Sequence, residues 1–220
     1  MKVATICSVY GSYDSLKELP EQTVPFEQIL VSEIHDGSNR GVFVEPRPHC
    51  HPRLAAKHAK CLPFEYTDAD VVVWVDGSIQ VTSADWLDFL IKESAGSPIS
   101  QYPHPQRDDI LDEADASLPM TKYDGHRLHA QAHHYLSLGH PRNWGLWSTG
   151  VIVYRKDAIG SNALDAFGKT WLTEQIRWTY QDQISEPYVL RTLGLRPRTI
   201  NDNLYDSPFL TLHAHPREDQ

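Results

Sequence analysis

Cysteine is scarce in this chain of 220 residues. The three cysteines, Cys7, Cys50 and Cys61, are odd in number and include no Cys-x-x-Cys pair. Small secreted domains depend on paired cysteines, so a disulfide framework is not expected here. Reduced thiols fit a cytoplasmic protein, and we predict a cytoplasmic location.

Basic charge is also in deficit, because Lys and Arg number 20 against 29 Asp and Glu, which leaves a net charge of -9. An acidic balance argues against non-specific binding to nucleic acid or anionic membranes, although a local basic pocket stays open. Long apolar runs are missing as well, since no segment approaches the ~18 consecutive apolar residues of a membrane span. The N-terminal segment lacks the features of a signal peptide, and we predict a first strand there.

The patterns that are present predict an α/β fold, with residues 1–220 as one domain around a mostly parallel central sheet flanked by helices. Strand patterns occupy 2–9, 28–34, 42–45, 71–76, 99–102 and 145–155, and helical patterns occupy 52–66, 84–96, 106–137, 161–179 and 181–193. Alternation of strands and helices is typical of crossover connections. The run VVVWV at 71–75 is apolar on both faces, as in a central parallel strand.

Two turns follow predicted strands at the sheet edge where open α/β sheets bind ligands. One is Asp76-Gly77-Ser78 after VVVWV, and the other is the turn Tyr10, Gly11, Ser12, Tyr13 and Asp14 after the first strand. Asp76 and Ser78 could present a carboxylate and a hydroxyl to a divalent cation, since hard cations take oxygen ligands. An ordinary Asp-Gly turn explains the same residues.

Basic residues gather on one predicted helix before VVVWV. Arg53, Lys57 and Lys60 are spaced i, i+4 and i+7, so they share a helical face. In an acidic protein this face suggests an anionic ligand such as a diphosphate. A solvated helix face is the alternative.

Histidines offer further candidate sites. His104 and Arg107, in a proline-stiffened loop, could bind sugar hydroxyls or take part in acid–base work. His129 and His133 could share a cation, but without an HExxH pattern a polar helix with surface histidines is favoured over a zinc site. His213 and His215 alternate near the C-terminus, and one of them could complete a cation site begun by Asp76, with a weak preference for manganese over magnesium.

Several segments in a fixed order resemble the TOD/MUCI-type glycosyltransferase-like domain family over roughly residues 3–215. They are YGSYDSLKE, PRLAAKHAK, LPFEY, VVVWVDGSIQV, HPQRDDILDEADA, STGVIVYR and DQISEPYVL. More distantly, the pattern is similar to GT-A glycosyltransferases of the glycogenin and galactosyltransferase kind. The resemblance implies a GT-A-like fold, with residues 1–80 as the nucleotide-binding half and 81–220 as the acceptor and sugar half.

The resemblance also implies roles for particular residues. Asp76, Gly77 and Ser78 stand where such enzymes carry the Asp-x-Asp that binds a metal and nucleotide diphosphate, with Ser78 replacing the second aspartate. Donor contacts are implied for Tyr10, Gly11, Tyr13, Asp14, Arg53, Lys57 and Lys60. Sugar or acceptor contacts are implied for Ser148, Thr149, Gly150 and Gln183, beside Asp182 near the reacting carbon. His213 or His215 would be the C-terminal metal ligand.

We therefore expect transfer of a sugar from a nucleotide-diphosphate sugar to a hydroxyl acceptor, assisted by Mn²⁺ or Mg²⁺. Asp182 could stabilise an oxocarbenium-like sugar, and Asp182 and Glu113 are the candidate bases if the reaction inverts. Analogy of fold favours retention. The acceptor could be a glycan, a lipid, a protein or a modified nucleobase. Residues 106–143 are expected to line the acceptor side of the site. The alternatives are a non-catalytic nucleotide-sugar or glycan-binding module and a metal-dependent phosphohydrolase.

Overall fold

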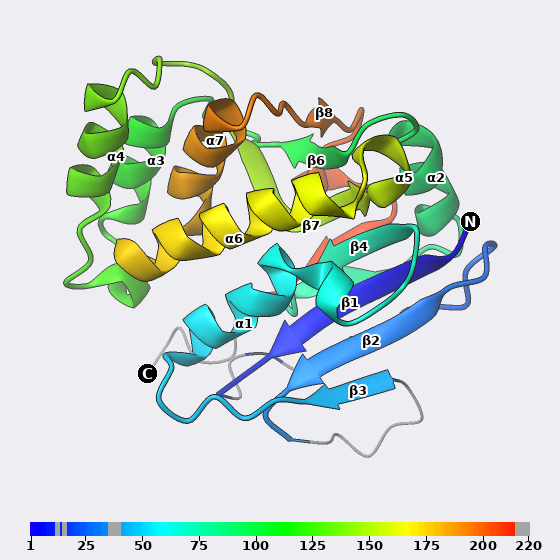
Figure 1. Cartoon of the computed structure of the whole chain (residues 1–220). Helices are drawn as coiled ribbons and strands as arrows, with labels where there is room; N and C mark the ends of the chain where they lie inside the picture. Colours follow the sequence, from blue (N-terminus) through cyan, green and yellow to red (C-terminus); the bar gives the residue numbers. More distant parts are fainter. Residues whose placement is uncertain (12–13, 15–16, 35–40, 214–220) are drawn as a thin grey trace.

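A mixed sheet forms the centre of the protein (Figure 1), and the computed structural model describes residues 1–11, 14, 17–34 and 41–213. The strand order is β3-β2-β1-β4-β7-β6-β8. Its strands are β1 (Val3–Val9), β2 (Glu27–Ser32), β3 (Gly41–Val44), β4 (Val71–Val75), β6 (Ile99–Pro103), β7 (Trp147–Arg155) and β8 (Arg198–Thr199). Pairs β3–β2, β2–β1, β1–β4 and β6–β8 are parallel, and β7 is antiparallel to both β4 and β6. The predicted α/β class with a mostly parallel sheet is confirmed.

Helices cover both faces of this sheet. They are α1 (Pro52–Cys61), α2 (Trp86–Glu93), α3 (Ile110–Ser117), α4 (Leu128–Ser137), α5 (Lys156–Ile159), α6 (Ser161–Arg177) and α7 (Asp182–Thr192). Helices α1, α6 and α7 pack in one core on the near face in Figure 1, and α2 packs in a second core on the other face. Helices α3 and α4 pack against α7 in a third cluster.

Strand β4 is the central strand that VVVWV predicts. Val72 and Trp74 belong to the core that contains α1, whereas Val71, Val73 and Val75 belong to the core that contains α2. All five side chains are buried. The strand ends at Val75, so Asp76 is the first residue beyond the apolar run.

Some predicted elements are wrong in extent. Helix 84–96 is shorter, at α2, and the polar segment 106–137 is split into α3, a 3₁₀ turn at Thr121–Tyr123 and α4. Pro119 has no N–H to continue α3, and Gly125 has a φ of 76°, which helical backbone excludes. The described residues 17–26, between β1 and β2, form no helix. Helix α1 lies in the connection from β3 to β4.

A small second sheet brings the end of the described chain to the turn after β4. Strands β5 (Ile79–Val81) and β9 (Leu210–Leu212) pair antiparallel, with Ile79 opposite Leu212. The backbone N–H of His213 then donates to the Ser78 carbonyl at 2.8 Å. His213 therefore lies beside the Asp76-Gly77-Ser78 turn.

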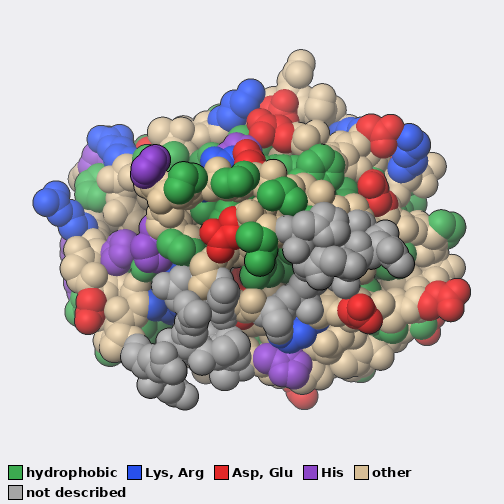
Figure 2. Space-filling model, turned by 90° about the horizontal axis from the view of Figure 1, so that it is seen from below, with side chains coloured by type: hydrophobic (Ala, Val, Ile, Leu, Met, Phe, Trp, Pro, Cys, Tyr) green, Lys and Arg blue, Asp and Glu red, His purple; other side chains and the backbone are tan. Residues whose placement is uncertain are grey.

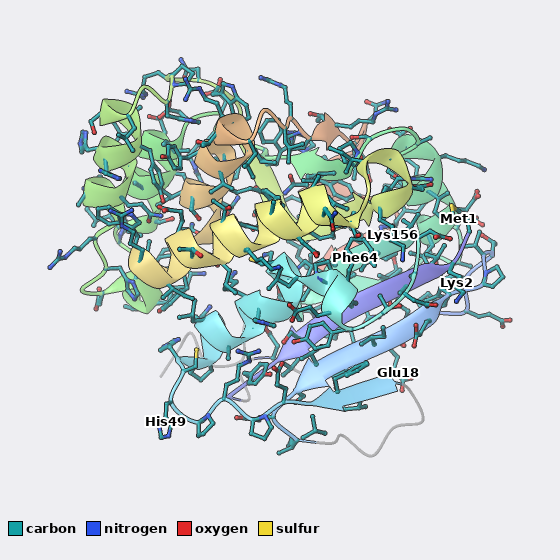
Figure 3. The ribbon with its side chains drawn as sticks, in the orientation of Figure 1. Met1, Lys2, Glu18, His49, Phe64 and Lys156 are labelled. Carbon is teal, nitrogen blue, oxygen red and sulfur yellow. The ribbon has the colours of Figure 1, made fainter. Side chains whose placement is uncertain are left out.

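The surface is polar at its margins. Seen from below (Figure 2), hydrophobic side chains gather near the middle of the visible face, and lysine and arginine lie mostly toward its rim. Lys156 lies beside Phe64 (Figure 3), with its Nζ 5.6 Å from the ring centroid. None of the helices in the described ranges combines the length and the apolar character that a bilayer crossing requires.

Candidate active site

A cavity opens at the carboxyl ends of β1 and β4, the edge where open α/β sheets bind ligands. It contains about 1120 Å³ of space, part of it open to solvent. The starts of α1, β7 and α7 complete its wall. The predicted site residues in its lining are Tyr10, Asp14, Arg53, Lys57, Asp76, Gly77, Ser78, Ser148, Thr149, Gly150, Asp182 and Gln183. Their roles in binding or catalysis stay predictions.

Asp76 lies at the cavity wall with its side chain 35% exposed. Its Oδ1 accepts a hydrogen bond of 2.7 Å from the Trp74 indole N–H, and Lys60 Nζ lies 3.4 Å from the same oxygen. Gly150 lets β7 approach closely, because a Cβ there would lie 2.9 Å from Ile79 Cδ1 and 3.6 Å from Asp76 Oδ2. One carboxylate oxygen is thus held from behind by the protein, and the carboxylate reaches the cavity.

Asp182, the first residue of α7, is held by two lysines of α1. Lys57 and Lys60 donate to Asp182 Oδ2 at 2.5 and 2.6 Å, and the Thr149 hydroxyl donates to Oδ1 at 2.9 Å. The Lys60 side chain is 1% exposed and that of Lys57 is 17% exposed. The predicted basic face is therefore largely an internal ion-pair network, in which Lys57 lines the cavity and Lys60 does not.

The charges of this network fix its protonation state. Burial alone would raise the pKa of Asp182, but the two ammonium groups hold that pKa well below its usual range. Burial acts to lower the pKa of Lys60, and Asp182 and Asp76 reverse this and raise it. Burial lowers the pKa of Lys57 despite its contact with Asp182. Asp182 is consequently an ionised carboxylate with weak basicity.

Asp14 lies against the turn after β4 although the two are distant in sequence. A Cβ on Gly77 would be 2.8 Å from Asp14 Cβ and 3.3 Å from Asp14 Oδ2. Glycine at 77 therefore permits the turn after β1 to approach the turn after β4. Asp14 and Asp76 both line the cavity as a result.

The other predicted residues of the first turn have structural contacts. The Tyr10 hydroxyl donates to the Glu45 carbonyl at 2.8 Å, and the Gly11 N–H donates to Glu33 Oε1 at 2.9 Å. Gly11 is absent from the cavity lining that the described residues form. Tyr13 lies outside the described residues.

His104, Arg107 and Glu113 form a separate cluster that does not reach the cavity lining. Arg107 Nε donates to Glu113 Oε2 at 2.6 Å, and burial together with the Arg107 charge lowers the pKa of His104 to about 4. Glu113 Oε1 accepts from the amide of Gln181 at 2.8 Å, and Gln181 lines the cavity. Glu113 thus contacts a wall residue but is not placed as a base for an acceptor in the cavity.

The predicted metal ligands are only partly assembled. Within the described ranges, no three His, Cys, Asp or Glu side chains gather closely enough to hold a metal, at the histidine-rich segment or elsewhere. His215 lies outside the described residues. Asp76, Ser78 and the adjacent His213 are donors of the types that Mn²⁺ accepts. Their role as metal ligands stays a prediction.

Several residues in the lining were missed by sequence reasoning. Lys122 and Tyr123 come from the 3₁₀ turn before α4, and Tyr180 and Gln181 precede α7. Tyr180 packs on His51 with ring centroids 4.8 Å apart and donates its hydroxyl hydrogen to the Lys122 carbonyl. For Lys122 and Tyr123 the sequence signal was the aromatic and basic content of 106–143, part of which does reach the cavity. Tyr180 and Gln181 lie outside that segment, and no motif marked them.

The fold has a counterpart among glycosyltransferases. A solved structure of a bifunctional glycosyltransferase, WbbM in its apo form, is similar with a TM-score of 0.52 and 14% identity over 94% of this chain. The chain spans 41% of that protein. This likeness assigns the glycosyltransferase fold to the chain.

Sequence comparison then gives the family. The TOD1/MUCI70, glycosyltransferase-like domain matches residues 10–208, and the chain belongs to this family. No curated protein matches the chain.

Proposed function

We propose that this protein transfers a sugar from a nucleotide-diphosphate sugar to a hydroxyl acceptor. The observation that carries the proposal is the pairing, in one cavity at the strand ends, of the Asp76 turn with Lys57. Lys57 contacts the cavity and is anchored by Asp182. An anchored ammonium beside a carboxylate turn suits a ligand that has both a diphosphate and sugar or ribose hydroxyls.

The Lys57 ammonium suits the step in which the nucleotide diphosphate leaves the donor sugar. The bond between the anomeric carbon and the diphosphate oxygen breaks, and its electron pair leaves with the diphosphate. The Lys57 ammonium can stabilise the charge that develops there. A cation brought with the diphosphate would be held by Asp76, Ser78 and His213 and would supply further charge stabilisation.

Asp182 suits charge stabilisation better than proton transfer. A general base works best when its pKa lies near the operating pH, and the lysines hold the pKa of Asp182 far below that range. The ionised carboxylate can still stabilise positive charge on the sugar. The acceptor oxygen forms the new bond and loses its proton. Asp182 is engaged by the lysines and Glu113 lies outside the lining, so neither is placed as the base that an inverting reaction needs. Retention of the anomeric configuration therefore stays our prediction, and in that reaction the departing phosphate oxygen accepts the acceptor's proton.

Thermal unfolding with a panel of nucleotide diphosphates tests the proposal. At about one hundred times Kd, a bound nucleotide should stabilise the protein by about 2.7 kcal/mol and raise Tm by about 5–10 °C. Mn²⁺ alone should give no shift, whereas Mn²⁺ added with the nucleotide should enlarge the shift. Asp76→Asn should remove the nucleotide effect, and Asp88→Asn, which alters an exposed pair with Lys92 on α2, should retain it.

The same samples separate an enzyme from a binding module. Release of free nucleotide diphosphate from the matching nucleotide sugar, abolished by Asp76→Asn, supports the transferase. Binding without any turnover in the presence of candidate acceptors supports the non-catalytic alternative. Absence of a shift with every nucleotide would contradict both, and phosphate release from simple esters would favour the hydrolase.

A further inference from the structure

A second hollow lies next to the cavity, on the side of α4 and α6. Gly125, His126, Arg127, Arg177 and Trp178 line it, around about 670 Å³ of largely open space. His126 packs edge-on against Tyr180 with ring centroids 4.5 Å apart, and Tyr180 lines the main cavity. The contact between His126 and Tyr180 therefore joins the wall of the hollow to the wall of the candidate active site.

The hollow is basic although the protein is acidic. Arg127 is exposed, and within the described part of the chain no carboxylate pairs with it. The Arg177 side chain is 59% exposed, and its NH1 lies 3.8 Å from Glu174, a loose contact. Two guanidinium groups thus face solvent beside one hollow, and guanidinium forks recognise carboxylate, sulfate and phosphate groups.

Trp178, in the lining of this hollow, offers one further donor. The Trp178 indole N–H is buried and, among the described residues, has no hydrogen-bond partner. A buried polar group without a partner is costly unless a ligand or water satisfies it. The indole also offers an apolar face of the kind found in ligand pockets.

We propose that this hollow binds an anionic unit of an oligosaccharide acceptor whose reacting hydroxyl lies in the main cavity. The inference rests on the proposed function and specifies the acceptor. A lipid would need an apolar groove, whereas two arginines line this hollow. A polar ligand with several units can span Tyr180 and His126 and place its charged group on Arg127 and Arg177. The donor diphosphate remains on the side of Asp76 and Lys57.

The test measures binding of matched oligosaccharides by calorimetry, with the nucleotide diphosphate present. The probes are a uronic-acid tetrasaccharide, its neutral carboxyl methyl ester, and sulfated and phosphorylated oligosaccharides of the same length. At least one anionic probe should bind about tenfold tighter than the neutral ester. The double variant Arg127→Gln/Arg177→Gln should lose that tenfold preference and retain its nucleotide affinity.

A charge-matched control excludes a general effect of net charge. Lys169→Gln/Arg191→Gln removes two exposed positive charges on α6 and α7 away from the hollow and should keep the preference. Equal affinity for neutral and anionic probes, or equal losses in both double variants, would overturn the inference. Binding of an acidic peptide but of none of the oligosaccharides would do the same. Failure of the wild-type protein to bind any nucleotide diphosphate would instead contradict the proposed function.

Discussion

Three carboxylates in or behind the cavity wall differ in their exposure and in their partners, and therefore in their chemistry. Asp76 is partly exposed and can meet a ligand. Asp182 is ionised but is held by Lys57 and Lys60. Glu186, one turn further along α7, is fully buried, and no ion pair forms on it among the described residues. Burial therefore raises its pKa to about 8, with a further contribution from the negative charge of Asp182.

Glu186 pairs with a single amide. Its Oε1 accepts from Gln101 Nε2 at 2.8 Å, and Glu186 Oε2 and Gln101 Oε1 are both buried without a hydrogen-bond partner among the described residues. Two acceptor oxygens cannot satisfy each other. A proton on Glu186 would supply a donor to this pair, which agrees with the raised pKa.

We expect Glu186→Gln to remove a pH dependence of stability. The folded state binds the Glu186 proton more tightly than the unfolded chain, whose pKa is near 4.5, so the contribution is complete below that pH. It is lost as pH rises toward about 8, by up to about 1.4 kcal/mol per pH unit. Urea unfolding across this range should show the wild type losing stability relative to the variant.

Glutamine keeps the shape and stays neutral at every pH, so it isolates the proton. Asp88→Asn, at an exposed pair, is the control and should follow the wild type. A constant difference between wild type and Glu186→Gln from about pH 5 to pH 8 would show that Glu186 is ionised throughout.

At the scale of elements, the crossing of α1 and α6 holds the lysines in place. Gly168 lies in the middle of α6, and a Cβ there would be 1.9 Å from the Cys61 carbonyl oxygen at the end of α1. The two helices therefore meet backbone to backbone. Because Lys57 and Lys60 extend from α1, their position depends on this contact.

Gly168→Ala should destabilise the protein although alanine favours helix by about 1 kcal/mol. Overpacking against α1 costs about 1–3 kcal/mol or more, and here backbone must move. We expect a lower midpoint in urea and, because α1 moves with Lys57, weaker nucleotide binding. Gly41→Ala is the matched control, since its Cβ meets no atom closer than 3.6 Å. Equal stability of the two variants would show that α1 relaxes without cost.

Elements marked by an unbroken apolar run or by a characteristic terminal residue could be predicted from the sequence. VVVWV predicted β4 because a strand buried on both faces needs apolar residues throughout, and helix α1 was predicted from its first-turn proline. The segment 106–137 was predicted less well, since its polar composition concealed the break between α3 and α4. The contact partners of individual side chains could not be predicted from the sequence. Lys57 and Asp182, for example, are 125 positions apart, and only the folded sheet brings α1 to α7.

At the scale of the whole molecule, the net charge creates a long-range electrostatic field around the candidate active site. The net charge is -9, whereas the charged side chains in the described cavity lining balance, with Arg53, Lys57 and Lys122 against Asp14, Asp76 and Asp182. The lining alone thus offers a diphosphate no excess of positive charge. This balance supports the proposal that a divalent cation arrives with the diphosphate.

The same balance predicts an unusual salt dependence of nucleotide binding. At low salt the negative field of the protein repels an anionic nucleotide, and the charged side chains of the described lining supply no opposing net charge. Raising KCl from about 0.01 M to about 0.15 M shortens the Debye length from about 30 Å to about 8 Å, so the association rate should rise, by about twofold or more. Stopped-flow fluorescence can follow this through Trp74 at the cavity wall. A rate that falls with salt would instead show that Arg53, Lys57 and Lys122 steer the nucleotide despite the neighbouring carboxylates.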